Sequence, residues 1–289
     1  MTVRREGTDL LRRAFVRIPP AQRLAILHGL GRYAPWEAKF DFTPPLPAPG
    51  EETGPPDFVG IGVQKAGTTW WYQLLSEHPG VSTRADLHKE RHFFDRFGTR
   101  PFGSSDVEDY QGWFPRRRGS LAGEWTPDYF TLPWVPPLLR EAAPEARLLL
   151  ILRDPVERFR SGLAHQQSVG VSRDGATIAD AVERGFYDRA LTRWLEHFEL
   201  EQLLVLQHER CITDFEAQLA TTFAFLGLEP PGADVGSPPR SRTIAPHPAL
   251  PDDVRRRLVD LYAPDVVALA TRLPDVDLAS WPNFAHLAE

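Results

Sequence analysis

The stretch FVGIGVQKAGTTWWYQLLSEHPG, residues 58–80, decides how this chain folds. Its first six residues form a short apolar, β-branched run, which is typical of a strand buried on both faces. A turn that contains a glycine follows, and then a helix over about 68–77 that ends at a His-Pro-Gly sequence. The stretch therefore predicts a strand–turn–helix unit, the building block of an α/β protein.

Two further apolar runs have the same character, RLLLIL at 147–152 and QLLVLQ at 202–207. Helices are expected at 133–143, 155–168, 176–184, 188–199, 213–226 and 251–272. Strands that alternate with helices indicate a parallel sheet covered on both faces. We therefore predict an α/β fold with three layers, α/β/α, around a central parallel sheet.

The first 57 residues differ in character from the rest of the chain. Residues 1–40 mix charges with scattered apolar positions, and residues 42–57 are rich in proline, glycine and acid. We expect a helical appendage and a linker over 1–57, and the main domain over 58–289.

Composition restricts the class of protein. With 289 residues, 42% of them hydrophobic, the chain is long enough to bury a sizeable core. Its net charge of −6 shows no excess of basic residues of the kind that indicates nucleic-acid binding. No apolar run reaches the roughly 18 residues of a membrane span, and the N-terminus lacks the apolar segment of a secretory signal. A single cysteine, Cys211, excludes an internal disulfide. These features predict a cytoplasmic protein without integral membrane association.

The turn at 62–67 is a candidate anion site. Its glycines allow several backbone N–H groups to face one anion, and the N-terminus of the following helix adds a positive dipole end. Lys65 lies within the turn, although only three of the 33 basic residues in the chain are lysines. The alternative is a tight turn whose threonines simply cap the helix.

The turn is close to the P-loop of nucleoside triphosphatases but differs at its lysine. Aligning Gly62 and Gly67 with that motif puts Thr68 at the lysine position, and Lys65 lies three residues earlier. No strand clearly ends in a magnesium-holding aspartate, because Asp154 before a proline is better interpreted as a helix cap. A P-loop kinase is therefore the second interpretation.

Five segments, in this order, resemble sulfotransferases that depend on 3′-phosphoadenosine 5′-phosphosulfate (PAPS). The segments are VGIGVQKAGTTWWYQLLSEHP (59–79), KERHFFD (89–95), GEWTPDYF (123–130), LLLILRDPVERFRSGLAHQ (148–166) and the block at 185–228. The chain looks most like the branch that includes heparan-sulfate N- and O-sulfotransferases and their bacterial relatives. This resemblance implies a P-loop-like fold, PAPS as cofactor, its desulfated form PAP as product, and no metal.

The resemblance also implies roles for single residues. The loop residues that would bind the 5′-phosphosulfate are Gln64, Lys65, Ala66, Gly67, Thr68 and Thr69. Arg153 and Ser161 would bind the 3′-phosphate. Arg240, Ser241 and Arg242 would add further cofactor contacts, although a solvated basic loop would look the same.

For the acceptor side, Lys65, Glu90 and His92 are the candidate catalytic residues. Sulfuryl transfer needs a base that takes the proton of the acceptor, and Glu90 is the first choice for it and His92 the second. It also needs positive charge near the sulfuryl oxygens, which Lys65 supplies. Lys89 would position Glu90 or bind an acidic acceptor. The alternative is that KERH is an ordinary solvated, salt-bridged segment.

Trp125 occupies a position where the family pattern often has lysine. It either stacks on a flat part of the acceptor or belongs to the core. The acceptor itself stays open between a hydroxyl or an amine of a glycan or small molecule, and so does the oligomeric state. A non-catalytic protein that binds PAP is a further alternative.

Overall fold

The computed structural model describes residues 43–84, 87–168, 175–229 and 249–288. Residues 42–95 and 102–289 form one structural unit, and Arg96–Pro101 are assigned to another. The helical appendage expected at 1–40 lies outside the described residues.

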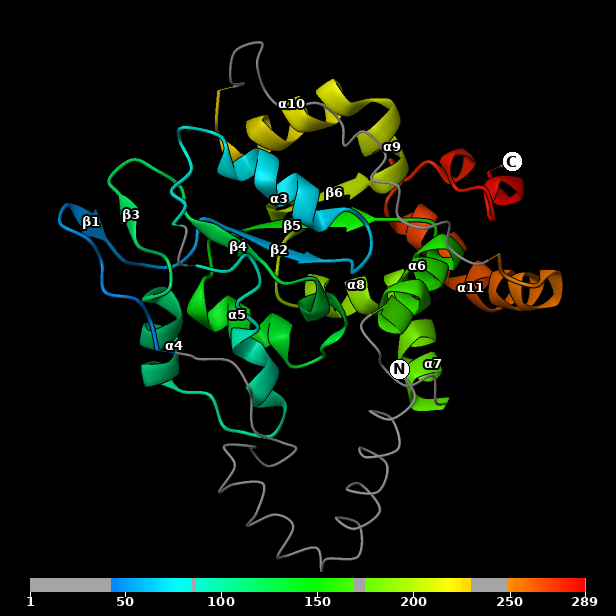
Figure 1. Ribbon diagram of the computed structural model, residues 1–289, viewed down its shortest axis with the longest axis horizontal. Helices are drawn as coiled ribbons and strands as arrows, with labels where there is room; N and C mark the ends of the chain where they lie inside the picture. The colour runs from blue at the N-terminus through cyan, green and yellow to red at the C-terminus, as the bar shows by residue number, and fades with distance from the viewer. Residues whose placement is uncertain (1–42, 85–86, 169–174, 230–248, 289) are drawn as a thin grey trace, which may run out of the picture. The chain divides into compact units, whose positions relative to one another are not determined.

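A parallel sheet forms the centre of the fold (Figure 1). Its strands are β2 (Phe58–Gly62), β4 (Gly123–Trp125), β5 (Arg147–Leu152) and β6 (Leu203–Gln207), in the spatial order β4-β2-β5-β6. Each neighbouring pair is parallel. The three strands expected from apolar runs are therefore confirmed within one residue at each end.

Helices cover both faces of the sheet. On one face lie α3 (Thr68–Ser76) and α10 (Phe215–Leu226), and on the other lie α5 (Val135–Ala142) and α8 (Tyr187–Leu195) (Figure 1). The remaining helices are α4 (Ser104–Gln111), α6 (Pro155–Ser168), α7 (Gly175–Glu183), α9 (His208–Thr213) and α11 (Asp252–Arg272). The three-layer α/β/α architecture is confirmed.

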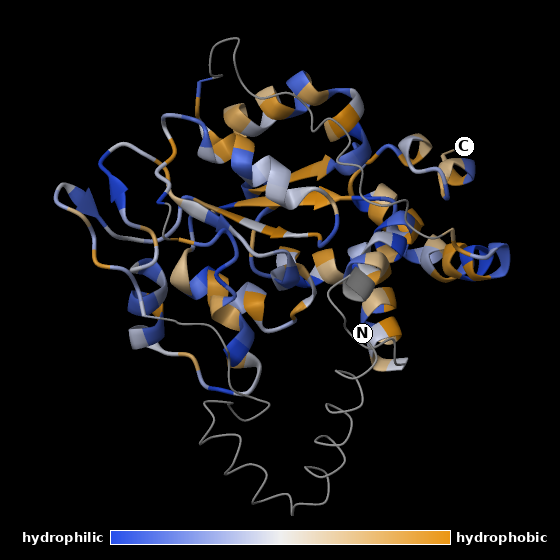
Figure 2. Cartoon of the chain, viewed as in Figure 1, coloured by the Kyte–Doolittle hydropathy of each residue, from blue (hydrophilic) through white to orange (hydrophobic). Residues whose placement is uncertain are grey.

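The core follows from the strand sequences. All five residues of β2 and the last five of β5 are buried, because both faces of a central parallel strand meet helices. Figure 2 shows β5 and β6 in the hydrophobic colours and the peripheral β1 (Glu51–Glu52) and β3 (Arg116–Arg117) in the hydrophilic ones. Within one helical layer, the indole N–H of Trp71 on α3 donates to Thr222 on α10 at 3.1 Å.

Strand β4 was not expected from the sequence. It has three residues, too few to show a period, and it begins with glycine, which is depleted in strands. Its place depends on Gly60 in β2, where a Cβ atom would lie 2.0 Å from the Trp125 ring. The missing side chain of Gly60 makes room for that indole, which then fills the space between the strand and its neighbours.

The stretch 42–57, expected as a linker, contains β1, which pairs antiparallel with β3. The helix expected at 213–226 is preceded by the short α9, with Asp214 between them.

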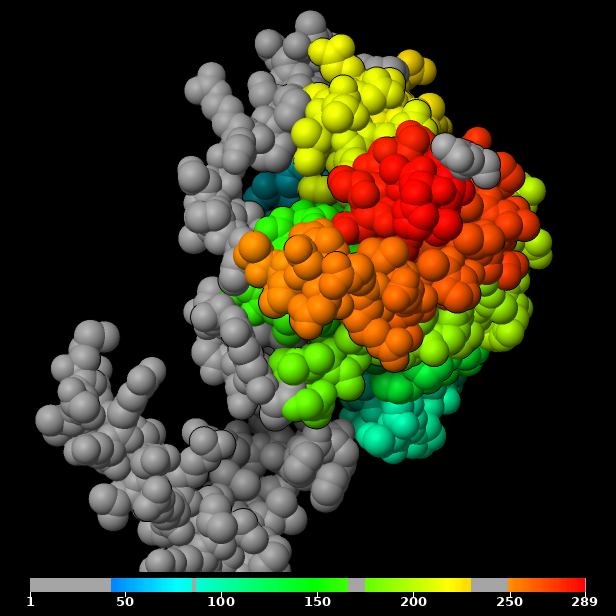
Figure 3. Space-filling model, turned by 90° about the vertical axis from the view of Figure 1, so that its right-hand side faces the viewer, coloured from blue at the N-terminus to red at the C-terminus, as the bar shows by residue number. Residues whose placement is uncertain are grey.

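Asp154 confirms its predicted role as a helix cap. Its Oδ1 accepts hydrogen bonds from the backbone N–H groups of Val156 and Glu157, at 2.9 and 3.2 Å. Its Oδ2 accepts from the backbone and side-chain nitrogens of Asn283, both at 2.9 Å. The cap therefore also holds the C-terminal segment, which lies beside α11 and α10 in Figure 3.

Candidate active site

The loop between β2 and α3 has the backbone of an anion cradle. Lys65 and Gly67 have positive φ angles of 72° and 87°. Gly67 is the N-cap of α3, and no side chain caps this helix. The N–H groups of the first turn therefore have no side-chain acceptor, which is the arrangement that binds anions at helix N-termini.

Two donors from neighbouring strands reach this loop. Arg153 follows β5, and its Nη1 donates to the Lys65 carbonyl oxygen at 2.8 Å. His208 follows β6, and its Nδ1 lies 3.0 Å from the Ala66 carbonyl oxygen. The carboxyl ends of parallel strands meet at one edge of the sheet, which is why residues 88 and 142 positions distant in sequence converge here.

Lys65 is half-buried within the loop. Burial lowers the pKa of its ammonium group first, and the positive charge of Arg153 lowers it further. The charge of Lys89 has the same direction, whereas that of Glu90 opposes it. These residues thus lie within electrostatic reach of one another.

The side chain of Lys89 reaches the first turn of α3 from a separate segment of the chain. Its Nζ donates to Thr68 Oγ1 and Thr69 Oγ1 at 3.2 and 3.3 Å, and lies 2.9 Å from Glu90 Oε1. The segment KERH, residues 89–92, is salt-bridged, as its composition indicated. It is not a solvated one, however, because the Lys89 side chain is only 13% exposed. The structure therefore brings Lys89 and Glu90 to the same helix N-terminus as Lys65.

Glu90, His92 and Asp95 form a hydrogen-bonded chain. Glu90 Oε2 lies 3.3 Å from His92 Nε2, and Asp95 Oδ2 lies 2.9 Å from His92 Nδ1. Asp128 Oδ2 is 4.0 Å from the same Nδ1, and Asp128 in turn pairs with Arg184. The imidazole thus has carboxylates on both sides.

These contacts separate the pKa values of the two candidate bases. Burial alone would raise the pKa of Glu90, but the hydrogen bond from His92 and the charge of Lys89 outweigh it and lower the pKa to about 2. Burial would lower the pKa of His92, but its hydrogen bonds to Asp95 and Glu90 outweigh that effect and raise it to about 10. At neutral pH, Glu90 is therefore a carboxylate that can accept a proton, and His92 is an imidazolium that cannot.

Several site residues were missed by sequence reasoning. Asp95 carried a signal, since it lies three residues after His92 in the motif that was singled out. His165 lies one helical turn after Ser161 on α6, and the lowered pKa of its ring reflects burial and then the charge of Lys65. Asp128 and His208 lie in the segments 123–130 and 185–228 that carry the resemblance, but no role was predicted for either residue.

The remaining predicted cofactor residues are placed as follows. Ser161 lies two turns into α6 and is 4% exposed. Gln64 is half-buried and Ala66 is buried in the loop. Arg240, Ser241 and Arg242 lie outside the described residues.

Trp125 does not face an acceptor. Its ring is fully buried, and its indole nitrogen donates to the Gly62 carbonyl oxygen at 3.2 Å. The stacking interpretation is therefore wrong, because pairing of β4 with β2 turns the indole into the core.

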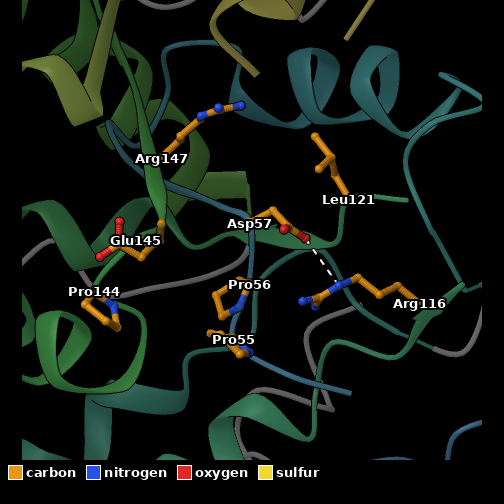
Figure 4. Close-up of a pocket in the computed structure, with 9 residues that line it drawn as sticks. Pro55, Pro56, Asp57, Arg116, Leu121, Pro144, Glu145 and Arg147 are labelled. Atoms are coloured by element: carbon orange, nitrogen blue, oxygen red, sulfur yellow. Dashed lines mark ion pairs between the residues drawn. The ribbon is translucent and has the colours of Figure 1, made fainter. Parts of the chain in front are cut away.

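A cavity of about 290 Å³ lies at the opposite end of the strands from Lys65, beside the amino ends of β2 and β5 (Figure 4). Its wall includes Asp57 and Arg116, which form an ion pair at 3.5 Å. Ligands of open α/β sheets bind beyond the carboxyl ends of the strands. This cavity is therefore separate from the site around Lys65.

Comparisons with known proteins agree with the loop and the fold. A family model described as "Sulfotransferase domain" matches residues 55–236, which is more than half of the chain. Heparan sulfate glucosamine 3-O-sulfotransferase 6 of Homo sapiens is 29% identical over 251 residues, covering 75% of this chain and 71% of that protein. Heparan sulfate glucosamine 3-O-sulfotransferase 3B1 of Mus musculus is 30% identical over 189 residues, covering 60% and 46%.

Among solved structures, a sulfotransferase from Alicyclobacillus acidocaldarius has the same fold, with a TM-score of 0.64 and 24% identity, covering 78% of this chain and 98% of that one. An α/β fold with a glycine loop before a helix, two lysines that converge there and an adjacent carboxylate agrees with a group-transfer enzyme. The chain belongs to the sulfotransferase domain family, in which it resembles the heparan-sulfate branch. It is an enzyme, a PAPS-dependent sulfotransferase, and the interpretation as a P-loop kinase is not favoured.

Two features are absent from the part of the chain that the structure describes. No helix in that part of the chain is long and apolar enough to cross a membrane. Within the same residues, no group of three or more His, Cys, Asp or Glu side chains is placed to hold a metal ion.

Proposed function

We propose that this sulfotransferase transfers the sulfuryl group of PAPS to a hydroxyl of a carbohydrate acceptor. Of the three candidate catalytic residues, Lys65 and Glu90 act on the reacting atoms, and His92 acts through Glu90. The observation that carries the proposal is the convergence of Lys65, Lys89 and Glu90 at the N-terminus of α3. The names of the relatives, glucosamine 3-O-sulfotransferases, support an acceptor that contains an amino sugar. A small-molecule hydroxyl or an amine is the second candidate.

The loop suits the 5′-phosphosulfate of the cofactor. A cradle with positive φ at Lys65 and Gly67, an uncapped helix start and the hydroxyls of Thr68 and Thr69 provides donors without any competing carboxylate in the loop itself. Gln64 and Ala66 complete the loop. For the 3′-phosphate we propose Arg153 and Ser161, with further contacts from the segment 240–242.

PAPS supplies an activated sulfuryl group bound to a good leaving phosphate. Glu90 accepts the proton of the acceptor hydroxyl while the new oxygen–sulfur bond forms and the bond from sulfur to the leaving phosphate oxygen breaks. Lys65 and Lys89 stabilise the negative charge that moves onto the leaving oxygen. His92, as an imidazolium held by Asp95, keeps Glu90 ionised and oriented.

We also propose that the reaction needs no metal. Two lysines supply the positive charge that Mg²⁺ provides in phosphoryl transfer. Asp154, which follows β5 where a metal-holding aspartate would be sought, uses its oxygens to cap α6 and to hold Asn283. The single cysteine, Cys211, which is buried, is in keeping with a reducing compartment such as the cytoplasm.

A thermal-shift panel of PAP, PAPS, ADP and ATP, each with and without Mg²⁺, tests the donor. PAP without metal is expected to stabilise the protein by about 2.7 kcal/mol at 100 times its dissociation constant. Stabilisation by ATP that equals that of PAP and depends on Mg²⁺ would contradict the proposal. Mass spectrometry of glucosamine oligosaccharides and simple phenols incubated with PAPS then distinguishes the acceptor classes.

A further inference from the structure

Two side chains from outside the phosphate loop, Arg153, proposed above for the 3′-phosphate, and His208, hold carbonyl groups of the loop from behind. Lys65 and Ala66 are consecutive, and their carbonyl oxygens accept from Arg153 and His208 respectively. We propose that His208 is a positioning residue of the donor site, which together with Arg153 forms a brace that keeps the loop N–H groups facing the bound phosphosulfate. This inference rests on the proposed function of the loop.

The loop needs such a brace because its backbone is strained. Lys65 has φ 72°, in the left-handed region that disfavours residues with a Cβ atom. Residues in such conformations persist only where their surroundings hold them. A carbonyl that turned inward would put an oxygen dipole where an anion binds, so fixing two consecutive carbonyls outward also fixes the amides inward.

The contact between His208 and the loop is close. A Cβ atom on Gly67 would lie 3.1 Å from His208 Nδ1, so the ring packs directly against the glycine that caps α3. His208 is the first residue of α9, and β6 immediately before it is anchored to β5 along its whole length. The imidazole therefore projects from a rigid element, which is what a positioning residue requires.

The chemistry of the ring agrees with a donor to a carbonyl. Burial and then the positive charge of Arg153 lower the pKa of His208 to about 4, so the ring is neutral at neutral pH. A neutral imidazole donates through one nitrogen only, and a carbonyl oxygen can only accept, so the proton lies on Nδ1. His208 thus adds a hydrogen bond behind the loop without adding a charge of its own.

Arg153, the second residue of the brace, is itself held in place. The hydroxyl of Tyr187 on α8 donates to the Arg153 carbonyl oxygen at 2.8 Å, and this tyrosine is fully buried. Both donors to the loop therefore start from positions fixed by the sheet and its helices.

Three variants of the full chain test the inference. His208→Leu keeps a bulky side chain but removes the donor, His208→Asn keeps an N–H group near the position of Nδ1, and Thr213→Ala on the exposed side of α9 is the matched control. The first readout is amide hydrogen exchange of residues 63–69 in the free protein. The second is the KM for PAPS compared with the KM for the acceptor, together with the Kd for PAP.

For His208→Leu we expect faster exchange confined to 63–69 and an increase in the Kd for PAP and the KM for PAPS of about 5- to 10-fold, the effect of one neutral hydrogen bond. The KM for the acceptor should change less than about twofold on the same reasoning, because His208 acts only behind the donor loop. His208→Asn should recover most of the loss, and Thr213→Ala should match the wild type.

Unchanged loop exchange in His208→Leu would overturn the brace, and so would a loss that His208→Asn fails to recover. Faster exchange spread equally over β5 and β6 would also overturn it, because the role would then be general stability. The exchange readout needs no ligand. A wild-type protein that fails to bind PAP would therefore refute the proposed function, while the exchange result would still decide on the brace.

Discussion

The Glu90 carboxylate and the His92 imidazolium are assigned opposite roles by their surroundings, although they lie two residues apart. His92 touches two carboxylates, Glu90 and Asp95, and has a third, Asp128, at 4.0 Å, whereas Glu90 touches a lysine and the imidazolium. Each residue is thereby held in its charged form. In the proposed reaction, Glu90 and not His92 is therefore the group that accepts the proton of the acceptor.

Glu90→Gln separates chemistry from binding. The amide keeps the shape and an oxygen but takes no proton, so the rate should fall by roughly 10²–10⁴-fold, the usual contribution of a positioned base. The affinity for PAP should stay nearly unchanged. Single-turnover kinetics and calorimetric titration with PAP measure the two quantities. Near-normal turnover in Glu90→Gln, with an inactive His92→Ala, would reverse the roles of the two residues.

The raised pKa of His92 predicts a pH dependence of stability. A group with a folded pKa of about 10, above the ordinary 6.5, stabilises the fold fully below pH 6.5 and loses that contribution as the pH rises through 10. Asp95→Asn removes the strongest partner and should bring the pKa of His92 down. Relative to wild type, this variant should lose stability at pH 6 and none above pH 10, as measured by urea unfolding.

As the pH is raised, the activity of Asp95→Asn should fall at a lower pH than that of the wild type, because the His92 imidazolium of the variant loses its proton at a lower pH. Asp109→Asn on the exposed surface of α4 is the control and should change neither profile. Identical pH profiles for wild type and Asp95→Asn would show that the charge of His92 does not support catalysis.

At the scale of elements, the turn from β2 into α3 combines conformational strain with an anion site. Gly67 has φ 87° and His208 directly against it, whereas Gly119 has φ 85° and nothing within 4 Å of an added Cβ atom. The two glycines thus have the same backbone requirement in different surroundings. A comparison of the two therefore isolates what the contact with His208 contributes.

Both Gly67→Ala and Gly119→Ala should lose about 1–2 kcal/mol of unfolding free energy through left-handed strain. Only Gly67→Ala should also lose affinity for PAP, because the added methyl group pushes on the His208 ring and shifts the loop. Chemical denaturation and calorimetric titration check the pair. Equal affinity for PAP in both variants would contradict the assignment of this loop to the donor.

At the scale of the whole molecule, the edge of the sheet depends on the close approach of Gly60 and Trp125. A Cβ atom at Gly60 would lie 2.0 Å from a fully buried indole in the layer between β2 and β4. Neither strand can shift easily, because β2 also pairs with β5 and the segment after β4 donates from the Thr126 N–H to the Gly60 carbonyl oxygen at 3.0 Å. A Cβ atom at Gly60 could therefore be accommodated only if β2 or β4 moved.

Gly60→Ala should therefore cost at least about 3 kcal/mol, at or above the upper range for overpacking a core, and should lower the melting temperature sharply. The double variant with Trp125→Leu should recover part of this loss, since the smaller side chain leaves room for the methyl group. Thermal unfolding of the single and double variants measures the coupling. A double variant no more stable than Gly60→Ala would show that the contact is not the cause.

Much of the fold and part of the site could be predicted from local patterns. The buried strands at 58–62, 147–152 and 203–207 are continuous apolar runs, and α6 begins after Asp154, a cap residue that the sequence shows. The glycine turn with Lys65 and the motif with Glu90 and His92 were also visible, because loop chemistry depends on residues that are neighbours in sequence. The N-terminal appendage, a bacterial origin, the cytoplasmic location and the contacts of 240–242 stay predictions.

The sequence by itself thus determined the three long buried strands, most of the helices, the glycine loop and the family, since periodicity, turn residues and motif order are properties of short segments. Only the tertiary structure decided that Trp125 belongs to the core, that Lys89 reaches the hydroxyls of Thr68 and Thr69, and that His208 stands behind the loop. The protonation of Glu90 and His92 was decided there too. The physical reason is that a contact or a pKa depends on which distant segments the sheet brings to the same edge, and no local pattern contains that pairing.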